Sequence, residues 1–143
     1  MHLFNIATLF VILTLLGVEF SVSAFVNPAA SRLEPESHLK MLSRAALVLG
    51  KVTPVWYSVS TLFLGIQTWL CWQTPGRSIL LTADAIMVLI AGASIFVLVP
   101  LAIRVAEGAA DWQRIQRIWD RRNRVRIAAL ATAAVLLTYA LAC

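Results

Sequence analysis

The sequence is poor in the residues that soluble domains and metal sites depend on. Only 13% of its 143 residues are charged, against 60% that are hydrophobic, so it has too little polar surface for a soluble domain of this size. Its histidines are His2 and His38, and it has two cysteines. These residues are too few and too far apart to bind a metal, and a di-iron bundle would need further carboxylates and histidines on facing helices. The sequence therefore predicts no metal or other cofactor.

Four long apolar runs account for the hydrophobic excess. A bilayer core ~30 Å thick takes about 20 helical residues, and a helix pairs its own backbone groups in lipid. The sequence lacks the alternating strands of a spanning barrel. It therefore predicts one all-α domain, residues 1–143, which is a polytopic membrane protein built as a four-transmembrane-helix bundle. We expect the helices at residues 3–27, 42–71, 78–101 and 123–142.

The first apolar run has a second interpretation as a secretory signal. Val22-Ser23-Ala24 resembles the small-residue cleavage site of such a signal. No lysine or arginine precedes the run, however, although a signal normally begins with a basic segment. We therefore expect a retained transmembrane helix.

Basic residues are almost absent from one side of the predicted bundle. Of the twelve lysines and arginines, only Arg77 lies outside the first and third connections and their flanks. The positive-inside rule then puts these two connections in the cytoplasm and both termini outside a bacterial-type inner (plasma) membrane. Topology and anionic lipid headgroups at the third connection explain the net charge of +5 without nucleic acid.

Both cysteines, Cys71 and Cys143, fall on the outer side in this topology. They could form a disulfide in an oxidising compartment. The alternative, which we favour, is two free thiols shielded by lipid.

The third connection is predicted to hold an amphipathic helix over residues 105–122. Trp112, Ile115 and Trp119 share one face of a helical wheel. The opposite face is cationic, with Arg114, Arg117, Arg121 and Arg124. This pattern is typical of an interfacial helix lying on the membrane. A cytosolic helix packed on a partner is the alternative, and either helix could run on into the last span through Asn123.

The first and third helices end alike. Pro28 is followed four residues later by Arg32, and Pro100 by Arg104. An internal duplication of two hairpins would explain the match. Convergence on proline and arginine at cytoplasmic helix ends explains it as well, and we favour this second interpretation.

Ionisable residues inside the apolar runs are the candidate functional residues. Glu19 lies on a polar stripe of the first helix. The second helix offers a seam of small or weakly polar residues of the kind that lets membrane helices approach closely: Lys51, Pro54, Ser58, Thr61, Gly65 and Thr68. At ~1.5 Å per residue, Glu19 and Lys51 both lie about 10 Å in from the cytoplasmic helix ends. We therefore expect Glu19 to meet Lys51, with Arg44, Asn123 and Arg126 as the next candidates.

Asp84 is the second acid within the apolar runs. It lies two helical turns from Arg77 and shares its wheel face, so we expect a structural ion pair between them. For Glu19 and Lys51, a functional site and a structural ion pair remain equally open.

Two stretches carry a resemblance to a known family: GVEFSVSAFVNP and VPLAIRVAEGAADWQRIQRIWDRRNRVRIAALATAAVLLTYAL. Through them the chain resembles the anthrone-oxygenase-like family of small four-helix membrane proteins, which in bacteria are mostly domains of unknown function. The matching residues are Gly17, Ser21 or Ser23, Pro28, Val99-Pro100-Leu101, and the pattern W-x-x-x-N-x-x-R formed by Trp119, Asn123 and Arg126. The resemblance implies a four-helix bundle and oxidation of a fused-ring phenolic anthrone without metal or flavin. Glu19 would be the base, and Asn123, Arg126 or Lys51 would stabilise the enolate oxygen.

Two functions follow from these observations. The first is an enzyme whose hydrophobic small-molecule ligand enters the bundle from lipid. The second is a non-catalytic accessory, scaffold or lipid-binding subunit of a larger membrane complex or homo-oligomer. An apolar pocket with Glu19 on its wall favours the enzyme, and a tightly packed interior favours the subunit. A transporter is disfavoured unless the chain oligomerises, because four helices enclose little aqueous volume.

Overall fold

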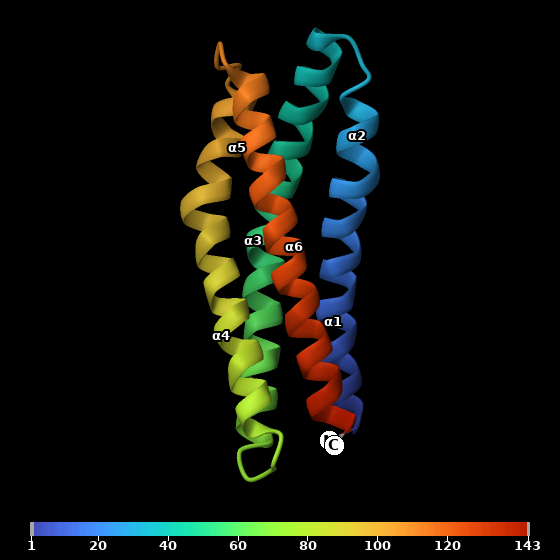
Figure 1. Ribbon diagram of the computed structural model, residues 1–143, viewed down its shortest axis with the longest axis vertical. Coiled ribbons are helices and arrows are strands. Elements are labelled where there is room, and N and C mark those ends of the chain that lie inside the picture. Colours follow the sequence, from blue (N-terminus) through green and yellow to red (C-terminus); the bar gives the residue numbers. More distant parts are fainter. Residues whose placement is uncertain (1, 143) are drawn as a thin grey trace.

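The computed structural model describes residues 2–142, which form a bundle of four long helices (Figure 1). Each of the four is long and apolar enough to cross a membrane, so the protein is a four-helix membrane bundle, as the sequence predicts. No strand occurs among the described residues. The elements are α1 (His2–Ser21), the π-helical η1 (Val22–Val26), α2 (Asn27–Ala30), α3 (Pro35–Leu70), α4 (Arg77–Ala93), the π-helical η2 (Ser94–Leu98), α5 (Val99–Ala106) and α6 (Trp112–Ala142).

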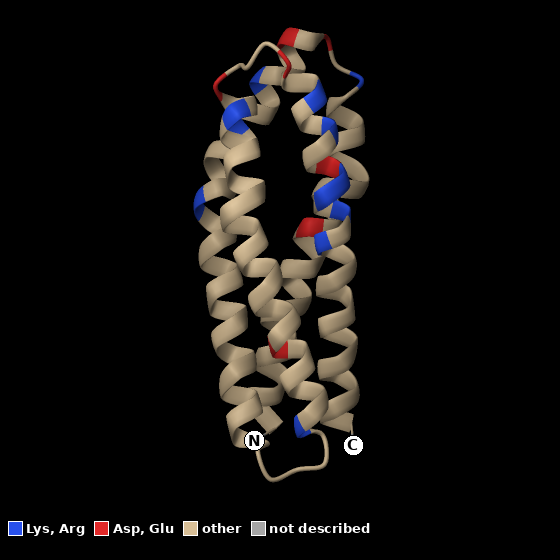
Figure 2. Cartoon of the chain, turned by 60° about the vertical axis from the view of Figure 1, so that its left-hand side comes forward, with Lys and Arg blue, Asp and Glu red and all other residues tan. Residues whose placement is uncertain are grey.

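The helices are longer than a bilayer core requires. At ~1.5 Å per residue α3 is about 54 Å long, whereas the hydrocarbon core is ~30 Å thick. Charged residues gather at one end of the bundle (Figure 2), which we call the charged end and which holds the connections 31–34 and 107–111. The opposite end, which we call the terminal end, holds His2, Ala142 and the turn 71–76. The helices therefore extend past the hydrocarbon core.

The structure differs from the prediction in the third connection. Residues 105–122 do not form a separate helix on the membrane surface, because α5 ends at Ala106 and α6 begins at Trp112. The turn between them uses Gly108, whose φ is +72°. No proline or glycine interrupts α6, so one helix runs from Trp112 through Asn123 to Ala142. The amphipathic segment is therefore the first part of the fourth bundle helix.

The apolar face of that segment packs against the bundle instead of the membrane. Ile115 is buried, and the ring of Trp112 contacts His38 of α3 edge to face, with centroids 5.1 Å apart. Trp119 is half-buried and lines an internal cavity described below. The arginines on the opposite face are exposed. The predicted role of Trp112, Ile115 and Trp119 at the membrane surface is thus wrong, since the bundle itself covers this face.

The half of the bundle toward the terminal end is closely packed. Small residues of α4 and α6 let these helices approach, among them the buried Ala83, Ala133 and Ala134. Large aliphatic side chains from all four helices fill the core: Ile12, Leu15, Leu64, Leu80, Met87, Leu130 and Leu137. The outer surface carries large exposed hydrophobic side chains such as Phe10, Trp69 and Val135. A helix that is apolar on its outward face as well as on its inward face is typical of a membrane span.

The first and third helices each contain one π-helical segment just ahead of a proline. The Asn27 N–H binds the carbonyl of Val22, and the Val99 N–H binds that of Ser94. Pro28 and Pro100 follow directly, each two residues after its π segment. A proline has no N–H and its ring clashes with the carbonyl four residues earlier, so a widened turn relieves that contact. The similarity of these two helix ends therefore extends from sequence to backbone conformation.

Candidate functional site

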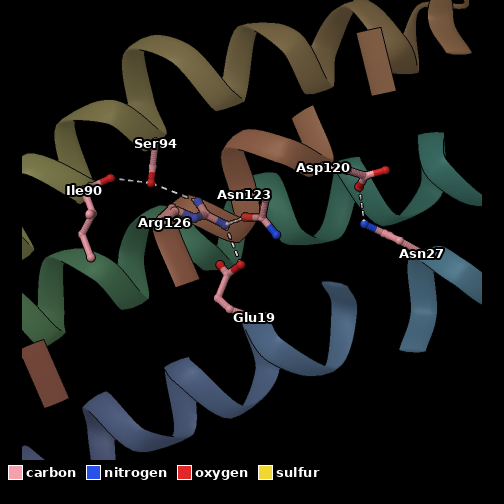
Figure 3. Close-up of polar contacts among 7 residues, drawn as sticks. All are labelled: Glu19, Asn27, Ile90, Ser94, Asp120, Asn123 and Arg126. Carbon is pink, nitrogen blue, oxygen red and sulfur yellow. Dashed lines mark hydrogen bonds and ion pairs between the residues drawn. The ribbon is translucent and has the colours of Figure 1, made fainter. Parts of the chain in front are cut away.

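Arg126 of α6 lies at the centre of a buried polar cluster (Figure 3). Its Nη2 donates to Glu19 Oε2 of α1 at 2.5 Å and to Asn123 Oδ1 at 2.6 Å. Its Nη1 donates to Ser94 Oγ at the start of η2 at 2.9 Å. The guanidinium carbon also lies 5.2 Å from the centroid of the Tyr57 ring of α3. A single side chain thus contacts all four helices of the bundle.

The ion pair is removed from solvent as well as from lipid. Only 6% of Glu19 and 8% of Arg126 is exposed. Transferring two charges out of water is costly, and their mutual attraction offsets this cost only with good geometry and further hydrogen bonds. Ser94 and Asn123 supply those bonds. Ionisable residues at membrane depth mark functional sites by default, so this cluster is the candidate site.

The predicted partner of Glu19 was wrong. Lys51 is exposed, and Arg126 occupies the place expected for it. The reason is the rotation of α3, which buries Tyr57, Ser60 and Leu64 and turns the predicted seam partly outward. Two residues at the same depth in the bundle can face opposite ways, and Lys51 faces outward whereas Glu19 faces the interior.

One of the other predicted partners, Arg126, does bind Glu19, and Asn123 joins the cluster through Arg126. Asn123 and Arg126 lie three residues apart on the inward face of α6, and both are buried. Trp119, which begins the W-x-x-x-N-x-x-R pattern, lies on the same face one turn further toward the charged end. Arg44, the third of these further candidates, is not among the partners of Glu19, whose carboxylate binds Arg126.

A cavity of about 420 Å³ extends from the cluster toward the charged end. Its volume falls in the range of ~300–1,000 Å³ typical of small-molecule sites. Figure 2 shows the helices standing further apart over this half of the bundle. The lining is mostly apolar, with Val22, Leu42, Ala46, Leu49, Leu98 and Ala102, and the polar groups Glu19, Asn27, Ser94, Gln116, Trp119 and Arg126. The interior therefore has an apolar pocket with Glu19 on its wall, although Glu19 is also paired.

Three hydrogen-bond donors of α6 lack an acceptor among the described residues. They are Trp119 Nε1, Asn123 Nδ2 and Arg126 Nε, all buried. Figure 3 shows the amide nitrogen of Asn123 turned away from Arg126. Each buried donor left without an acceptor costs ~1–3 kcal/mol. Trp119 and Arg126 line the cavity, so their free donors are suited to a ligand that carries oxygen acceptors.

A second polar contact, absent from our predictions, holds the first helix to α6. Asn27 Nδ2 donates to Asp120 Oδ1 at 2.7 Å, and Gln116 Nε2 donates to the same oxygen at 3.1 Å. Asn27 follows Glu19 by eight residues, which puts the two within about 80° of each other on the helical wheel. This shared side of the first helix was the available signal for the inward position of Asn27. Asp120 is harder to find in the sequence because arginines surround it. This contact places η1 and α2 beside α6.

The predicted ion pair of Asp84 with Arg77 was also wrong. Asp84 Oδ2 accepts a hydrogen bond from Thr68 Oγ1 of α3 at 2.6 Å. The Arg77 guanidinium lies over the Trp72 ring instead, 4.1 Å from its centroid. Trp72 stands in the turn directly before α4, so it is the nearer partner for the first residue of that helix.

Cys71, one of the two residues of the disulfide alternative, stands in the turn between α3 and α4. Cys71 is buried and its Sγ accepts a hydrogen bond from Gln67 Nε2 at 3.2 Å. Cys143 lies outside the described residues. Among the residues that the structure describes, no group of three or more His, Cys, Asp or Glu is placed to hold a metal ion.

Comparison of the chain with known protein families, with characterised proteins and with solved structures finds no match. The resemblance to the anthrone-oxygenase-like family therefore remains a prediction. The candidate site is therefore defined by its geometry alone: the Glu19–Arg126 ion pair lies at the inner end of an apolar cavity.

Proposed function

We propose that this protein binds a lipid-soluble ring compound in the cavity and oxidises it with dioxygen, without metal or flavin. The observation that supports the proposal is that the cavity of about 420 Å³ ends on the buried Glu19–Arg126 pair. A dry apolar pocket with one carboxylate on its wall is suited to removing an acidic C–H proton from a hydrophobic substrate.

Glu19 serves as the base. Its hydrogen bonds among the described residues use Oε2 alone, which leaves Oε1 to take a proton. The substrate is a ring ketone with an acidified CH₂ group, such as an anthrone. Proton transfer to Glu19 leaves an enolate, whose carbon donates electrons to dioxygen and forms a C–O bond. The peroxide anion takes the proton back from Glu19, and the resulting hydroperoxide loses water, so that CH₂ and O₂ become C=O and H₂O.

The donors of α6 stabilise the negative charge that develops on the enolate oxygen. Asn123 Nδ2 and Arg126 Nε have no acceptor among the described residues. Preorganised donors aimed at developing charge in a dry site lower the barrier substantially. Arg126 also orients the Glu19 carboxyl group before the substrate binds.

The proposed setting is a bacterial-type inner membrane with the charged end in the cytoplasm and both termini outside. The concentration of lysine and arginine at the charged end supports this orientation. Of the exposed arginines of α6, those nearest the bilayer, such as Arg121 and Arg124, contact anionic lipid headgroups.

The test is oxidation of anthrone by the purified protein in detergent, followed by oxygen uptake and by the absorbance of the quinone product. Glu19→Gln is expected to lower turnover by about 10²–10⁴-fold, the range for general base catalysis. Glu36→Gln is the matched control, because Glu36 is exposed and pairs only with Lys40 among the described residues. Circular dichroism verifies that both variants are folded. Unchanged turnover in folded Glu19→Gln protein removes Glu19 as the base.

A non-catalytic accessory, scaffold or lipid-binding subunit is the second candidate. One observation favours it, an open groove between α3 and α4 that faces outward. Small residues on its floor, including Ser58, Gly65 and Ala91, permit close approach of another membrane helix. Purification in mild detergent tests this function, since recovery of the chain with lipid alone counts against a larger complex or homo-oligomer. The triple change of Arg114, Arg117 and Arg121 to alanine should then weaken assembly without unfolding the bundle.

A further inference from the structure

The cavity has a side opening between η1 and α3. Val18 and Val26 line the cavity from the first helix, yet 38% and 37% of these residues is exposed. On the other side Leu47 of α3 lines the same cavity and is 65% exposed. Residues that border both the inside and the outside mark the rim of an opening.

The first helix leaves α3 at the level of Glu19 and returns to it near the charged end. Toward the terminal end, Trp56 Nε1 of α3 donates to the Val11 carbonyl at 3.2 Å, which holds the two helices together. Past Ser21, η1 packs against α6, where Asn27 binds Asp120. The short connection 31–34 then brings the chain back to the start of α3. The opening is therefore closed at both ends by contacts and held apart between them.

The depth and composition of the rim suit a surface that faces lipid. Counted from His2 at ~1.5 Å per residue, Val18 lies about 24 Å and Val26 about 36 Å along the bundle, so the opening spans the inner edge of a hydrocarbon core ~30 Å thick. Its rim residues Val18, Val26 and Leu47 are all aliphatic. A water-soluble ligand would find no polar contact with these side chains.

We propose that the ligand enters the cavity sideways from the bilayer between η1 and α3, and that Gly50 keeps this entrance open. This inference rests on one part of the proposed function, which is that the cavity binds a ligand. It does not require that the ligand is oxidised. Gly50 lies on the exposed side of α3 and lines the cavity. A Cβ atom added there meets no atom within 4 Å, so close packing does not require glycine. Glycine is a poor helix former, and its value at this position is the space it leaves.

The experiment uses the full chain in phosphatidylcholine vesicles, with both native cysteines replaced by alanine and Val22→Cys as a reporter inside the cavity. N-(1-pyrenyl)maleimide, which dissolves in the bilayer, and a charged, membrane-impermeant maleimide are compared. Gly50→Trp is expected to slow labelling by the pyrene reagent about tenfold. Gly17→Trp is the matched control, because Gly17 is also exposed with no atom within 4 Å of an added Cβ, but does not line the cavity.

Lateral entry is supported when the pyrene reagent labels the Val22→Cys protein faster than the charged reagent does and only Gly50→Trp slows it. It is overturned when the charged reagent reacts as fast, when neither reagent reacts, or when Gly50→Trp has no effect. Leu47→Trp, on the same rim, replaces Gly50→Trp if that variant does not fold. Labelling requires no turnover, so a protein that proves unable to oxidise anthrone still gives a clear answer about the entrance.

Discussion

Replacing Arg126 by methionine removes the cation that joins all four helices while keeping a side chain of similar length. The change leaves the Glu19 carboxyl group buried without its cationic partner and takes away the donors to Ser94 and Asn123. Breaking a buried ion pair from one side costs ~3–5 kcal/mol. Glu19→Gln removes the negative charge and leaves the buried guanidinium without a counter-ion, and we expect it to cost about 3 kcal/mol. In the double variant no charge remains unpaired, so it should lose no more than the less stable single variant, which corresponds to a coupling energy of about 3 kcal/mol.

The assay is unfolding by sodium dodecyl sulfate in mixed micelles, followed by far-ultraviolet circular dichroism at fixed pH. Free energies of unfolding for the four proteins complete a double-mutant cycle. If the double variant loses as much stability as the two single variants together, Glu19 and Arg126 are not a coupled, buried pair. A loss below about 1 kcal/mol for Arg126→Met would do the same, since exposed pairs contribute that little.

Three other changes test separate contacts. Asn27→Ala removes a donor to the α6 carboxylate and should cost about 1–2 kcal/mol, with faster amide hydrogen exchange in η1 and α2; unchanged exchange contradicts a role for this bond in holding η1. Lys51→Ala alters an exposed side chain, so the free energy of unfolding should change by less than about 0.5 kcal/mol; lost anthrone oxidation would return Lys51 to the site. Gly76→Ala puts a Cβ 3.2 Å from the Ala140 carbonyl oxygen and should lower the thermal midpoint in detergent. Gly65→Ala, with open space around it, is its control, and equal midpoints contradict the close approach.

The number of helices and their membrane character could be predicted because apolar length is recorded directly in the sequence. The rotation of each helix could not. A period of 3.6 residues tells which side chains share a face, but not which face meets which neighbour. The seam that includes Lys51 was the expected inward side of α3, and the structure buries Tyr57 instead.

The third connection shows a related limit. A Trp/Ile face opposite arginines is compatible with a membrane surface and with a bundle interior, because both are apolar on one side. The absence of proline and glycine from Trp112 to Ala142 was the signal for one continuous helix. Ser94 had no signal of its own, since a serine within an apolar run is ordinarily satisfied by its own helix backbone. The cavity itself depends on the distance between helices, which no local pattern records.

The two π segments have a consequence for how the first and third helices can vary. Each π turn holds one more residue than an α turn, so everything beyond Val26 or Leu98 is rotated by about 100° relative to an uninterrupted helix. Deleting one residue from either segment would leave the closely packed half of that helix unchanged and rotate the half that follows by about 100°. In the first helix, Asn27 would then swing off Asp120 and the entrance would lose the wall that faces α3. The single extra residue in each π turn therefore fixes how the half of the bundle that holds the cavity is rotated relative to the closely packed half.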